Sequence, residues 1–385
     1  MPKLIRITTA PISLSVLLPG QMRFMREQGM EVLMISSEGP ELQDVVDREG
    51  CRHVVVPMTR RISPWQDLLC LFQLIRLFKQ EKPDIIHSHT PKAGLLSMLA
   101  GLISGVKVRI HTVAGLRYVS EVGFRRRLLI GMERITSWAA THVWVNGKSL
   151  EQKLRTDHIT QASKISMVGV GSSNGIDLTR FNSDSLVPEV LEKAKKSIRY
   201  DSKNRYIICV GRLVGDKGIN ELVDVFSQLN RKYPLLKLIL VGAYESELDP
   251  ISPLTKKMIG EDPNILVTGW TSDVAYYLSL AALLVHPSHR EGFPNVLLQA
   301  GALGCPVVCS EIDGNRDIVE NRISGLTFSV KDRQSLADTL EIALSEYSQM
   351  QRYAAVLQKK VVENFSQPVF WKLVLEKYQS IMASQ

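Results

Sequence analysis

Short apolar runs alternate with helical patterns along the whole chain of 385 residues. Each run is continuously apolar, as expected of strands that are covered on both faces. The first series of predicted strands lies at residues 4–8, 31–36, 53–57, 84–88, 106–112, 142–146 and 165–170, with helices such as 64–80 and 125–140 between them. Strands that alternate with helices predict a parallel, doubly wound α/β sheet.

A second series begins after residues 171–204, where the strand pattern weakens and turn residues gather. Its strands are expected at residues 205–210, 236–241, 265–268, 283–286, 306–310 and 326–329, with helices at 188–199, 220–232, 273–281 and 295–303 and a helical tail from 333. We therefore predict two Rossmann-like domains, residues 1–175 and 176–385, with the last helix (about 367–385) packing back on the first domain. Such domains are expected to face each other across a cleft, because open α/β sheets bind ligands outside the carboxyl ends of their strands.

Charge and cysteine content narrow the classes of function. The formal net charge of +8 and the pI near 9.2 suit phosphate-bearing ligands or an anionic membrane surface, although a solvated surface rich in lysine is the simpler alternative. No basic and aromatic module is visible, so nucleic acid is not an expected partner. The five cysteines lack paired spacing, which argues against disulfides and zinc and predicts core thiols in a reducing compartment.

The sequence shows no targeting or membrane-spanning segment. The N-terminus enters the strand pattern directly, without the apolar region of a signal peptide, and Arg76 and Lys79 interrupt the richest apolar stretch. We expect a cytoplasmic protein. Arginines precede apolar residues at 60–65 and 125–130, which suits peripheral contact with the inner face of an anionic membrane, or else two solvated basic faces.

The most informative segment reads His-Pro-Ser-His-Arg-Glu-Gly-Phe-Pro-Asn-Val-Leu-Leu-Gln-Ala-Gly at residues 286–301. It begins where a buried strand is expected to end, and its loop leads into a helix with Pro294 suited to the first turn. Loop N–H groups and a helix N-terminus together form a site for anions and hydroxyls. Glu291 can accept hydrogen bonds from sugar hydroxyls; alternatively, it only offsets the helix dipole.

The second segment reads Gly-Arg-Leu-Val-Gly-Asp-Lys-Gly at residues 211–218, between a predicted strand and a helix. The guanidinium of Arg212 presents several N–H donors in one plane, and the ammonium of Lys217 presents a compact positive charge. The two side chains can converge on a diphosphate. The glycine spacing matches neither a P-loop nor a dinucleotide fingerprint. A basic turn exposed to solvent is the alternative.

Together the two segments resemble the retaining glycosyltransferases of family 4, whose fold is the two-domain GT-B type. Residues 87–94 (His-Ser-His-Thr-Pro-Lys-Ala-Gly), 113–117 (Val-Ala-Gly-Leu-Arg) and 172–177 (Ser-Ser-Asn-Gly-Ile-Asp) extend the resemblance to the branch that makes capsule and O-antigen units. The resemblance covers nearly the whole chain. It implies retaining transfer of a hexose or N-acetylhexosamine from a nucleotide sugar, usually UDP-linked, to a glycan acceptor on a polyprenyl diphosphate.

The resemblance also assigns roles to residues. Arg212 and Lys217 would hold the donor diphosphate, and Glu291 would contact the donor sugar. The donor-binding residues that it implies besides these are Gly211, Gly292, Phe293, Pro294, Asn295, Gln299 and Asn174. The family's second acid falls on Gln299, which lacks charge, so altered donor affinity or nucleotide preference is expected.

No metal and no other cofactor is expected. The resemblance implies a metal-independent enzyme, and the sequence contains no Asp-x-Asp triplet to hold a divalent ion over a diphosphate. Charge on the leaving group would then be offset by Arg212, Lys217 and helix N-termini.

Many relatives carry a histidine where this chain has Ala114, so a catalytic role would shift to His111 or be lost. A buried strand histidine is the alternative for His111. The loop at residues 9–20 would face the acceptor or merely cap the first helix. Predicted acceptor-side residues are Ser13, Ser15, His89 and Lys92.

Two other functions fit the same architecture. A nucleotide-sugar 2-epimerase would need carboxylates placed for elimination and no acceptor site. A non-catalytic subunit that binds nucleotide sugars is suggested only by Gln299 and Ala114.

Overall fold

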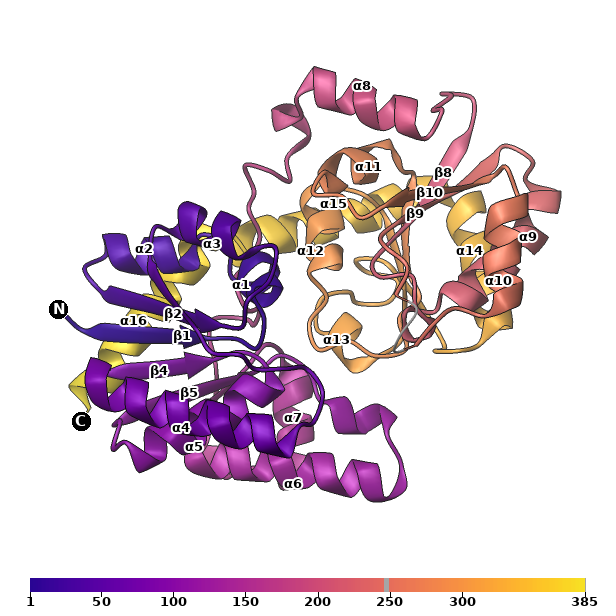
Figure 1. Ribbon diagram of the computed structural model, residues 1–385. Helices are drawn as coiled ribbons and strands as arrows, with labels where there is room; N and C mark the ends of the chain where they lie inside the picture. Colours follow the sequence, from indigo (N-terminus) through magenta and orange to yellow (C-terminus); the bar gives the residue numbers. More distant parts are fainter. Residues whose placement is uncertain (246–248, 385) are drawn as a thin grey trace. The chain divides into compact units, whose positions relative to one another are not determined.

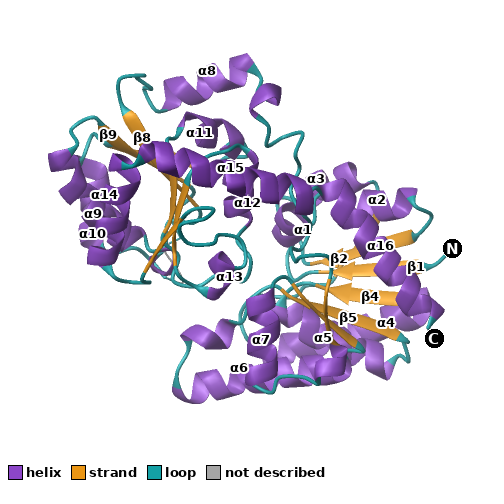
Figure 2. Cartoon of the chain, turned by 180° about the vertical axis from the view of Figure 1, so that it is seen from behind, coloured by secondary structure: helices purple, strands orange, loops and turns teal. Residues whose placement is uncertain are grey.

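The computed structural model describes residues 1–245 and 249–384, so Gln385, the end of the predicted last helix, lies outside the described residues. The chain divides into two compact units. The first is Met1–Gly175 together with Gln367–Gln385, and the second is Ile176–Ser366. Each unit is a parallel sheet covered by helices (Figure 1, Figure 2), which confirms the predicted fold of two doubly wound α/β domains.

The sheet of the first unit has seven strands in the order β3-β2-β1-β4-β5-β6-β7. The strands are β1 Lys3–Ile7, β2 Glu31–Ser36, β3 Arg52–Val55, β4 Ile85–Ser88, β5 Val108–Val113, β6 His142–Val145 and β7 Ile165–Met167. The helices are α1 Pro11–Leu17, α2 Gln21–Glu27, α3 Leu42–Glu49, α4 Pro64–Glu81, α5 Pro91–Ile103, α6 Gly123–Ala139, α7 Lys148–Thr156 and α16 Gln367–Ala383.

Unbroken apolar strands arise because both faces of this sheet are covered. On β1, Leu4 packs into a core beneath α2 and α16, whereas Ile5 packs into a separate core beneath α4 and α5. Successive strand residues point to opposite faces, so covering both faces requires apolar residues at every position.

Two predicted segments differ from the structure. Residues 9–20 do not form a loop throughout, because Pro11–Leu17 fold as α1 and bury Leu14, so Ser13 and Ser15 lie on a helix. The strand predicted at 165–170 ends at Met167, because Gly169 takes a φ of +54° and turns the chain.

The sheet of the second unit has six strands in the order β10-β9-β8-β11-β12-β13. The strands are β8 Arg205–Val210, β9 Leu236–Val241, β10 Ile265–Gly269, β11 Leu283–His286, β12 Val307–Ser310 and β13 Leu326–Phe328. The helices are α8 Pro188–Ser197, α9 Ile219–Lys232, α10 Pro253–Glu261, α11 Val274–Leu280, α12 Asn295–Ala302, α13 Asp313–Arg316, α14 Arg333–Ser345 and α15 Tyr347–Asn364. The chain runs outward from β8 and returns to β11 on its other side, so the strand order reverses between these two strands. Such a switch point leaves a crevice at the carboxyl ends.

The last helix joins the first unit through a buried polar cluster. Arg6 on β1 is 1% exposed and contacts Gln21, His87 and Tyr378, the last of these on α16. Burial raises the pKa of Tyr378 to about 12. A buried guanidinium is costly unless its N–H groups have partners, so the hydroxyl of Tyr378 ties α16 to the sheet.

We predict that Tyr378→Phe lowers the free energy of unfolding by about 1–3 kcal/mol, because it leaves a buried donor of Arg6 without its hydroxyl partner. Urea denaturation measures this change. Tyr353→Phe is the control, since no hydrogen bond of the Tyr353 hydroxyl occurs in the described part of the chain, and a change near zero is expected. Equal effects of the two substitutions would contradict this role for Tyr378.

Candidate active site

Two loops leave the carboxyl edge of the second sheet at its switch point. Residues 211–218 follow β8 and are named the β8 loop; residues 287–294 follow β11 and are named the β11 loop. Because β8 and β11 are hydrogen-bonded neighbours, the two loops start side by side.

Gly218 sets how closely these loops approach. Its φ is +69°, and a Cβ atom built on it would lie 2.1 Å from the carbonyl oxygen of Pro287. A side chain there would clash with backbone in a conformation that L-residues rarely adopt. Glycine at this position therefore allows the end of the β8 loop to press against the β11 loop.

Three contacts hold the loops together. The backbone N–H of His289 donates to the carbonyl oxygen of Asp216 at 2.8 Å, and Arg290 pairs with the Asp216 carboxylate at 2.9 Å. Lys217 Nζ lies 2.5 Å from Glu291 Oε1. The structure thus brings together Lys217 and Glu291, which the sequence places 74 residues apart.

Glu291 is a largely buried carboxylate with several partners. Ser288 Oγ donates to its Oε1 at 2.7 Å, and His286 Nε2 lies 3.1 Å from the same oxygen. Burial alone would raise the pKa of Glu291, but the neighbouring His286 ring and the charge of Lys217 outweigh it and hold the pKa well below its ordinary value. The side chain is therefore an ionised hydrogen-bond acceptor. Within the described residues its side-chain hydrogen bonds and ion pairs all fall on Oε1.

The backbone of the β11 loop is supported from behind by α13. A Cβ atom on Gly314 would lie 2.7 Å from the carbonyl oxygen of Glu291, so only glycine fits against the loop there. Asn315 Nδ2 donates to the carbonyl oxygen of Ser310 at 2.8 Å, and the Ser310 hydroxyl in turn donates to the carbonyl oxygen of Ser288. The sequence alone does not predict these supporting residues: His286 and Ser288 lie in the segment at residues 286–301 without an assigned role, and no local signal marks Gly314.

Arg212 lies at the start of the β8 loop and is apart from the Glu291 cluster. It is 53% exposed and pairs with Glu245, which follows β9. The neighbouring backbones nearly touch, since a Cβ atom on Gly242 would lie 1.8 Å from the carbonyl oxygen of Gly211. Arg212 thus stands on the same carboxyl edge with an exposed guanidinium.

The remaining predicted donor residues of this unit continue the β11 loop into α12. Gly292 and Pro294 precede the helix, which begins at Asn295, and Phe293 packs on Phe365 with ring centroids 5.8 Å apart. Gln299 lies one turn into α12 and is partly exposed.

In the first unit, His111 is a buried residue of β5. Its Nδ1 lies 2.8 Å from the hydroxyl of Ser88, and its ring packs against Gly94 so closely that a Cβ atom there would be 2.4 Å away. Burial lowers the pKa of His111 to about 4. These contacts favour the core alternative over the catalytic one.

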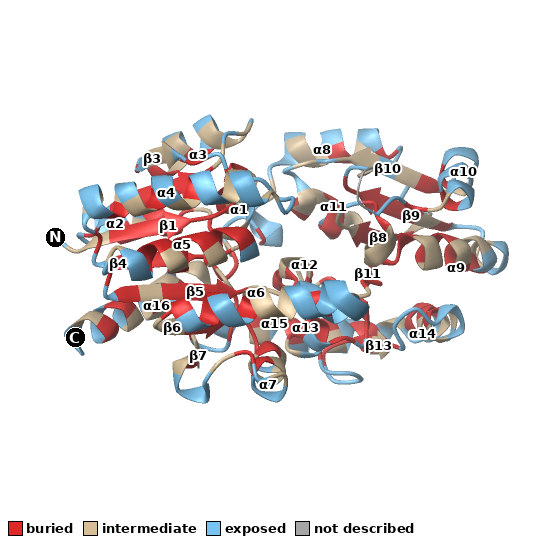
Figure 3. Ribbon diagram, turned by 60° about the horizontal axis from the view of Figure 1, so that its bottom comes forward, coloured by how far each residue is buried: buried red, intermediate tan, exposed pale blue. Residues whose placement is uncertain are grey.

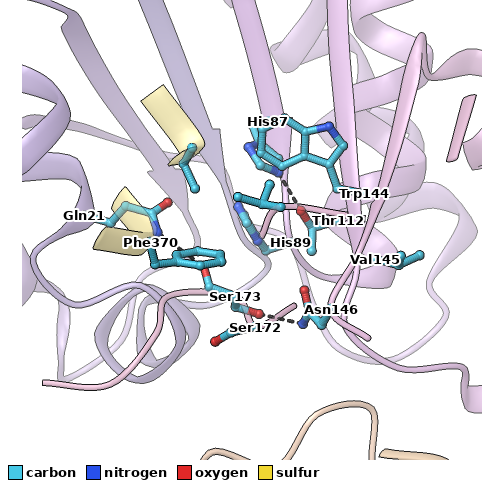
Figure 4. A pocket seen from close by; sticks show the side chains of 12 residues that line it. Gln21, His87, His89, Thr112, Trp144, Val145, Asn146, Ser172, Ser173 and Phe370 are labelled. Carbon is cyan, nitrogen blue, oxygen red and sulfur yellow. Dashed lines mark hydrogen bonds between the residues drawn. The ribbon is translucent and has the colours of Figure 1, made fainter. Parts of the chain in front are cut away.

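His89 lines a cavity of about 10 Å³ at the ends of β4, β5 and β6, shown in Figure 4. Its ring stacks on His87 with centroids 4.2 Å apart, and neither of its nitrogens has a hydrogen-bond partner within the described chain. Burial, followed by the charge of Arg6, holds the pKa of His89 well below its ordinary value. The cavity has room for about one water molecule beside His89.

The other predicted residues of this unit have partners inside it. The Oδ1 atom of Asn174 accepts hydrogen bonds from Gln21 and Trp371, and its Nδ2 donates to the carbonyl oxygen of Pro19. Both ends of the Asn174 amide are therefore engaged. Lys92 forms an ion pair with Asp67 at 2.7 Å and is 8% exposed. Each of these side chains stabilises the packing of its own unit.

Comparison with known proteins identifies the family. The model of the glycosyl transferase 4-like domain matches residues 18–171, and that of glycosyl transferases group 1 matches residues 191–359. The chain is 34% identical over 366 residues to the capsular polysaccharide biosynthesis glycosyltransferase CapM of Staphylococcus aureus, covering 95% of this chain and 94% of CapM. The chain belongs to the GT-B glycosyltransferases.

Two further proteins are similar over nearly their whole length. The UDP-Gal:alpha-D-GlcNAc-diphosphoundecaprenol alpha-1,3-galactosyltransferase of Escherichia coli is 24% identical, with 94% of each chain covered. The crystal structure of Anabaena HepE in complex with UDP and glucose superposes with a TM-score of 0.83 at 17% identity, covering 99% of this chain and 100% of HepE. The likeness to CapM confirms the predicted resemblance to transferases of capsular polysaccharide biosynthesis, and the superposition on HepE confirms the fold.

Within residues 1–245 and 249–384, no group of three histidine, cysteine, aspartate or glutamate side chains could hold a metal ion. No helix in the same residues is both long and apolar enough to span a bilayer. All five cysteines are buried and free, as the sequence predicts.

We predict that Glu291→Gln lowers the free energy of unfolding of this glycosyltransferase by about 2–3 kcal/mol at pH 7. The loss is smaller than for a fully buried ion pair, because the Lys217 side chain is 20% exposed and solvent screens its charge. The folded pKa of Glu291 is depressed, so its contribution is complete above the unfolded value of about 4.3 and is lost as the pH falls through the folded pKa. The difference between wild type and variant should therefore shrink below about pH 4 in urea denaturation.

The matched control is Glu261→Gln, since Glu261 is 68% exposed and lies 3.9 Å from Lys257. This change should cost less than about 0.5 kcal/mol at every pH. A difference for Glu291→Gln that does not vary with pH would contradict an ionised carboxylate with a depressed pKa.

Proposed function

We propose that this glycosyltransferase moves a hexose or N-acetylhexosamine from a UDP-sugar to a glycan acceptor on a polyprenyl diphosphate, with retention of anomeric configuration, at the cytoplasmic face of the membrane. The observation that carries the proposal is the contact between Lys217 and Glu291 at the switch point of the second sheet. It joins a cation suited to phosphate and a carboxylate suited to hydroxyls within one site.

Lys217 has hydrogen-bonding capacity for a diphosphate. An ammonium group has three N–H donors, and Glu291 takes one of them at 2.5 Å. The remaining donors can reach phosphate oxygens beside the N-terminus of α12, which also favours anions. We assign Lys217 to the donor diphosphate, with the exposed guanidinium of Arg212 as the second cation.

Glu291 is suited to the sugar rather than to the phosphate. Its Oε1 is taken up by Lys217 and Ser288, and its Oε2 is the oxygen that would accept from a sugar hydroxyl. Since the carboxylate stays ionised, such a hydrogen bond is charge-assisted. The fixed loop backbone at Gly292 and Phe293 would align the sugar at this carboxylate.

The relatives support the donor and acceptor classes. The Escherichia coli relative is named for transfer of galactose from UDP to a sugar on diphosphoundecaprenol, and HepE was crystallised with UDP and glucose. We infer a UDP-linked donor and a lipid-linked acceptor for this chain as well. The full-length likeness to named transferases favours this function over a 2-epimerase.

We further propose that cations of the chain replace a divalent metal. A diphosphate leaving group develops charge as the glycosidic bond breaks, and preorganised cations stabilise that charge. Lys217 is held by Glu291 and Arg212 by Glu245, so both are already oriented at the carboxyl edge.

Lys217→Ala and Arg212→Ala should each lower kcat/KM by about 10²- to 10³-fold, because each removes a cation that offsets leaving-group charge. The measurement is release of UDP from UDP-hexoses in the presence of a prenyl-diphosphate glycan acceptor and EDTA, where the wild type should stay active. Lys232→Ala is the control, because Lys232 pairs with Glu341 on an exposed surface. Near-wild-type rates for Lys217→Ala would refute the assignment.

Gln299→Glu should tighten binding of the nucleotide sugar by about five- to tenfold, if Gln299 contacts the nucleotide ribose, because a charged acceptor strengthens that hydrogen bond. Isothermal titration calorimetry measures the affinity. The control is Gln351→Glu, which adds the same charge on the exposed side of α15 and should leave the affinity for the nucleotide sugar unchanged. An unaltered affinity for both variants would remove Gln299 from the donor site.

A further inference from the structure

Helix α6 of the first unit has an unusual distribution of side chains. The residues on its inner side include Glu133, Thr136 and Ser137, all buried. Its outer side carries Phe124 and Trp138, which are 80% and 66% exposed. Leu129 and Ile130 of the same helix pack against the core, so the apolar residues on the outer side are additional to those that hold α6 in place.

The exposed apolar residues of α6 form a stripe on one face of the helix, interrupted at Gly131. Phe124, Leu128, Ile135 and Trp138 are exposed and follow a spacing of three, four or seven residues. Residues at this spacing lie on one face of a helix. Arginines 127 and 134 are exposed and flank the stripe at the positions next to Leu128 and Ile135.

Helix α4 carries a second stripe of the same kind. Trp65, Leu68 and Phe72 are exposed at a spacing of three and four residues, and exposed Arg76 extends the row by one turn. The opposite side of α4 packs into the core through Leu74 and Phe78. The outward apolar residues are therefore additional to those that the fold requires.

The two stripes belong to one layer of helices. α4 and α6 both pack against α5, which lies between them on the same face of the first sheet (Figure 1). Figure 3 shows exposed segments on both helices. Exposed aromatic side chains on two helices of one layer exceed the scattered apolar residues of an ordinary surface.

The charge of this layer selects the kind of partner. Residues 117–138 contain five arginines and two glutamates, and one of the glutamates, Glu133, is buried. Residues 60–76 contain three arginines and one acid, Asp67, which is already paired with Lys92. Aromatic and aliphatic side chains rimmed by arginine fit the interface of an anionic bilayer.

We propose that the outer faces of α4 and α6 form a membrane-docking surface that inserts Trp65, Phe72, Phe124 and Trp138 among the headgroups of anionic lipids. This inference rests on the proposed function, since a lipid-linked acceptor is presented at such a surface. Docking would hold the first unit at the bilayer and raise the local concentration of the acceptor.

The test is co-sedimentation of the full-length protein with vesicles of phosphatidylglycerol and phosphatidylethanolamine, compared with phosphatidylcholine alone. The wild type should bind the anionic vesicles. Trp65→Ser with Phe72→Ser, and separately Phe124→Ser with Trp138→Ser, should each weaken binding by about tenfold or more. Arg76→Gln with Arg127→Gln should weaken it only for the anionic vesicles.

Matched controls come from the second unit. Trp270→Ser removes a tryptophan that is 71% exposed, and Arg231→Gln with Arg352→Gln removes two exposed arginines. Both should leave vesicle binding unchanged. Equal binding by the docking variants and the wild type would overturn the proposal. The proposal would also be overturned if the wild type self-associates without lipid and the same substitutions abolish that self-association. The stripes would then be an interface between copies of the chain.

Turnover separates this proposal from the proposed function. The docking variants should process a short-chain, water-soluble acceptor at the wild-type rate and an acceptor embedded in vesicles at least about tenfold more slowly. Loss of vesicle binding with no change in turnover of embedded acceptor would overturn a role in acceptor access. A wild type that binds vesicles but transfers sugar to neither acceptor would refute the proposed function and leave the docking surface standing.

Discussion

The contact of Lys217 with Glu291 is the interaction on which the proposed site depends. It exists because Gly218 allows the backbone of the β8 loop to meet the backbone at Pro287, at a distance that excludes any side chain. The contact solves two problems at once. It keeps the buried carboxylate of Glu291 ionised. It also holds Lys217 at the switch point of a parallel sheet, with N–H donors that remain available to a ligand.

The two units use buried polar residues in different ways. In the second unit, Glu291 and Lys217 lie at the open carboxyl edge and keep part of their surface exposed. In the first unit, Arg6, His87 and Tyr378 form a closed cluster that fastens the last helix to the sheet. Partnered polar groups of this second kind serve stability, which explains why histidines with strongly lowered pKa values need not be catalytic.

The sequence predicted the strands well because continuous apolar runs bounded by turn residues have few alternatives in an α/β fold. It also identified Lys217 and Glu291 individually, through the resemblance. It did not indicate their direct contact or the support from Gly314, since both depend on backbone approaches between segments distant in the chain. The helix at residues 11–17 was missed, because a short apolar stretch with serines fits a loop as well as a helix.

The most direct test of the account is calorimetric titration of Glu291→Gln and Lys217→Ala with UDP and with a UDP-hexose that the wild type binds. If Lys217 holds the diphosphate and Glu291 the sugar, Lys217→Ala should weaken both ligands. Glu291→Gln should weaken the UDP-hexose by about tenfold, the value of one charge-assisted hydrogen bond, and UDP by much less, because the glutamine oxygen can still accept from Lys217. A Glu291→Gln enzyme that binds the two ligands with equally reduced affinity, or with no reduction at all, would contradict the division of roles on which the account rests.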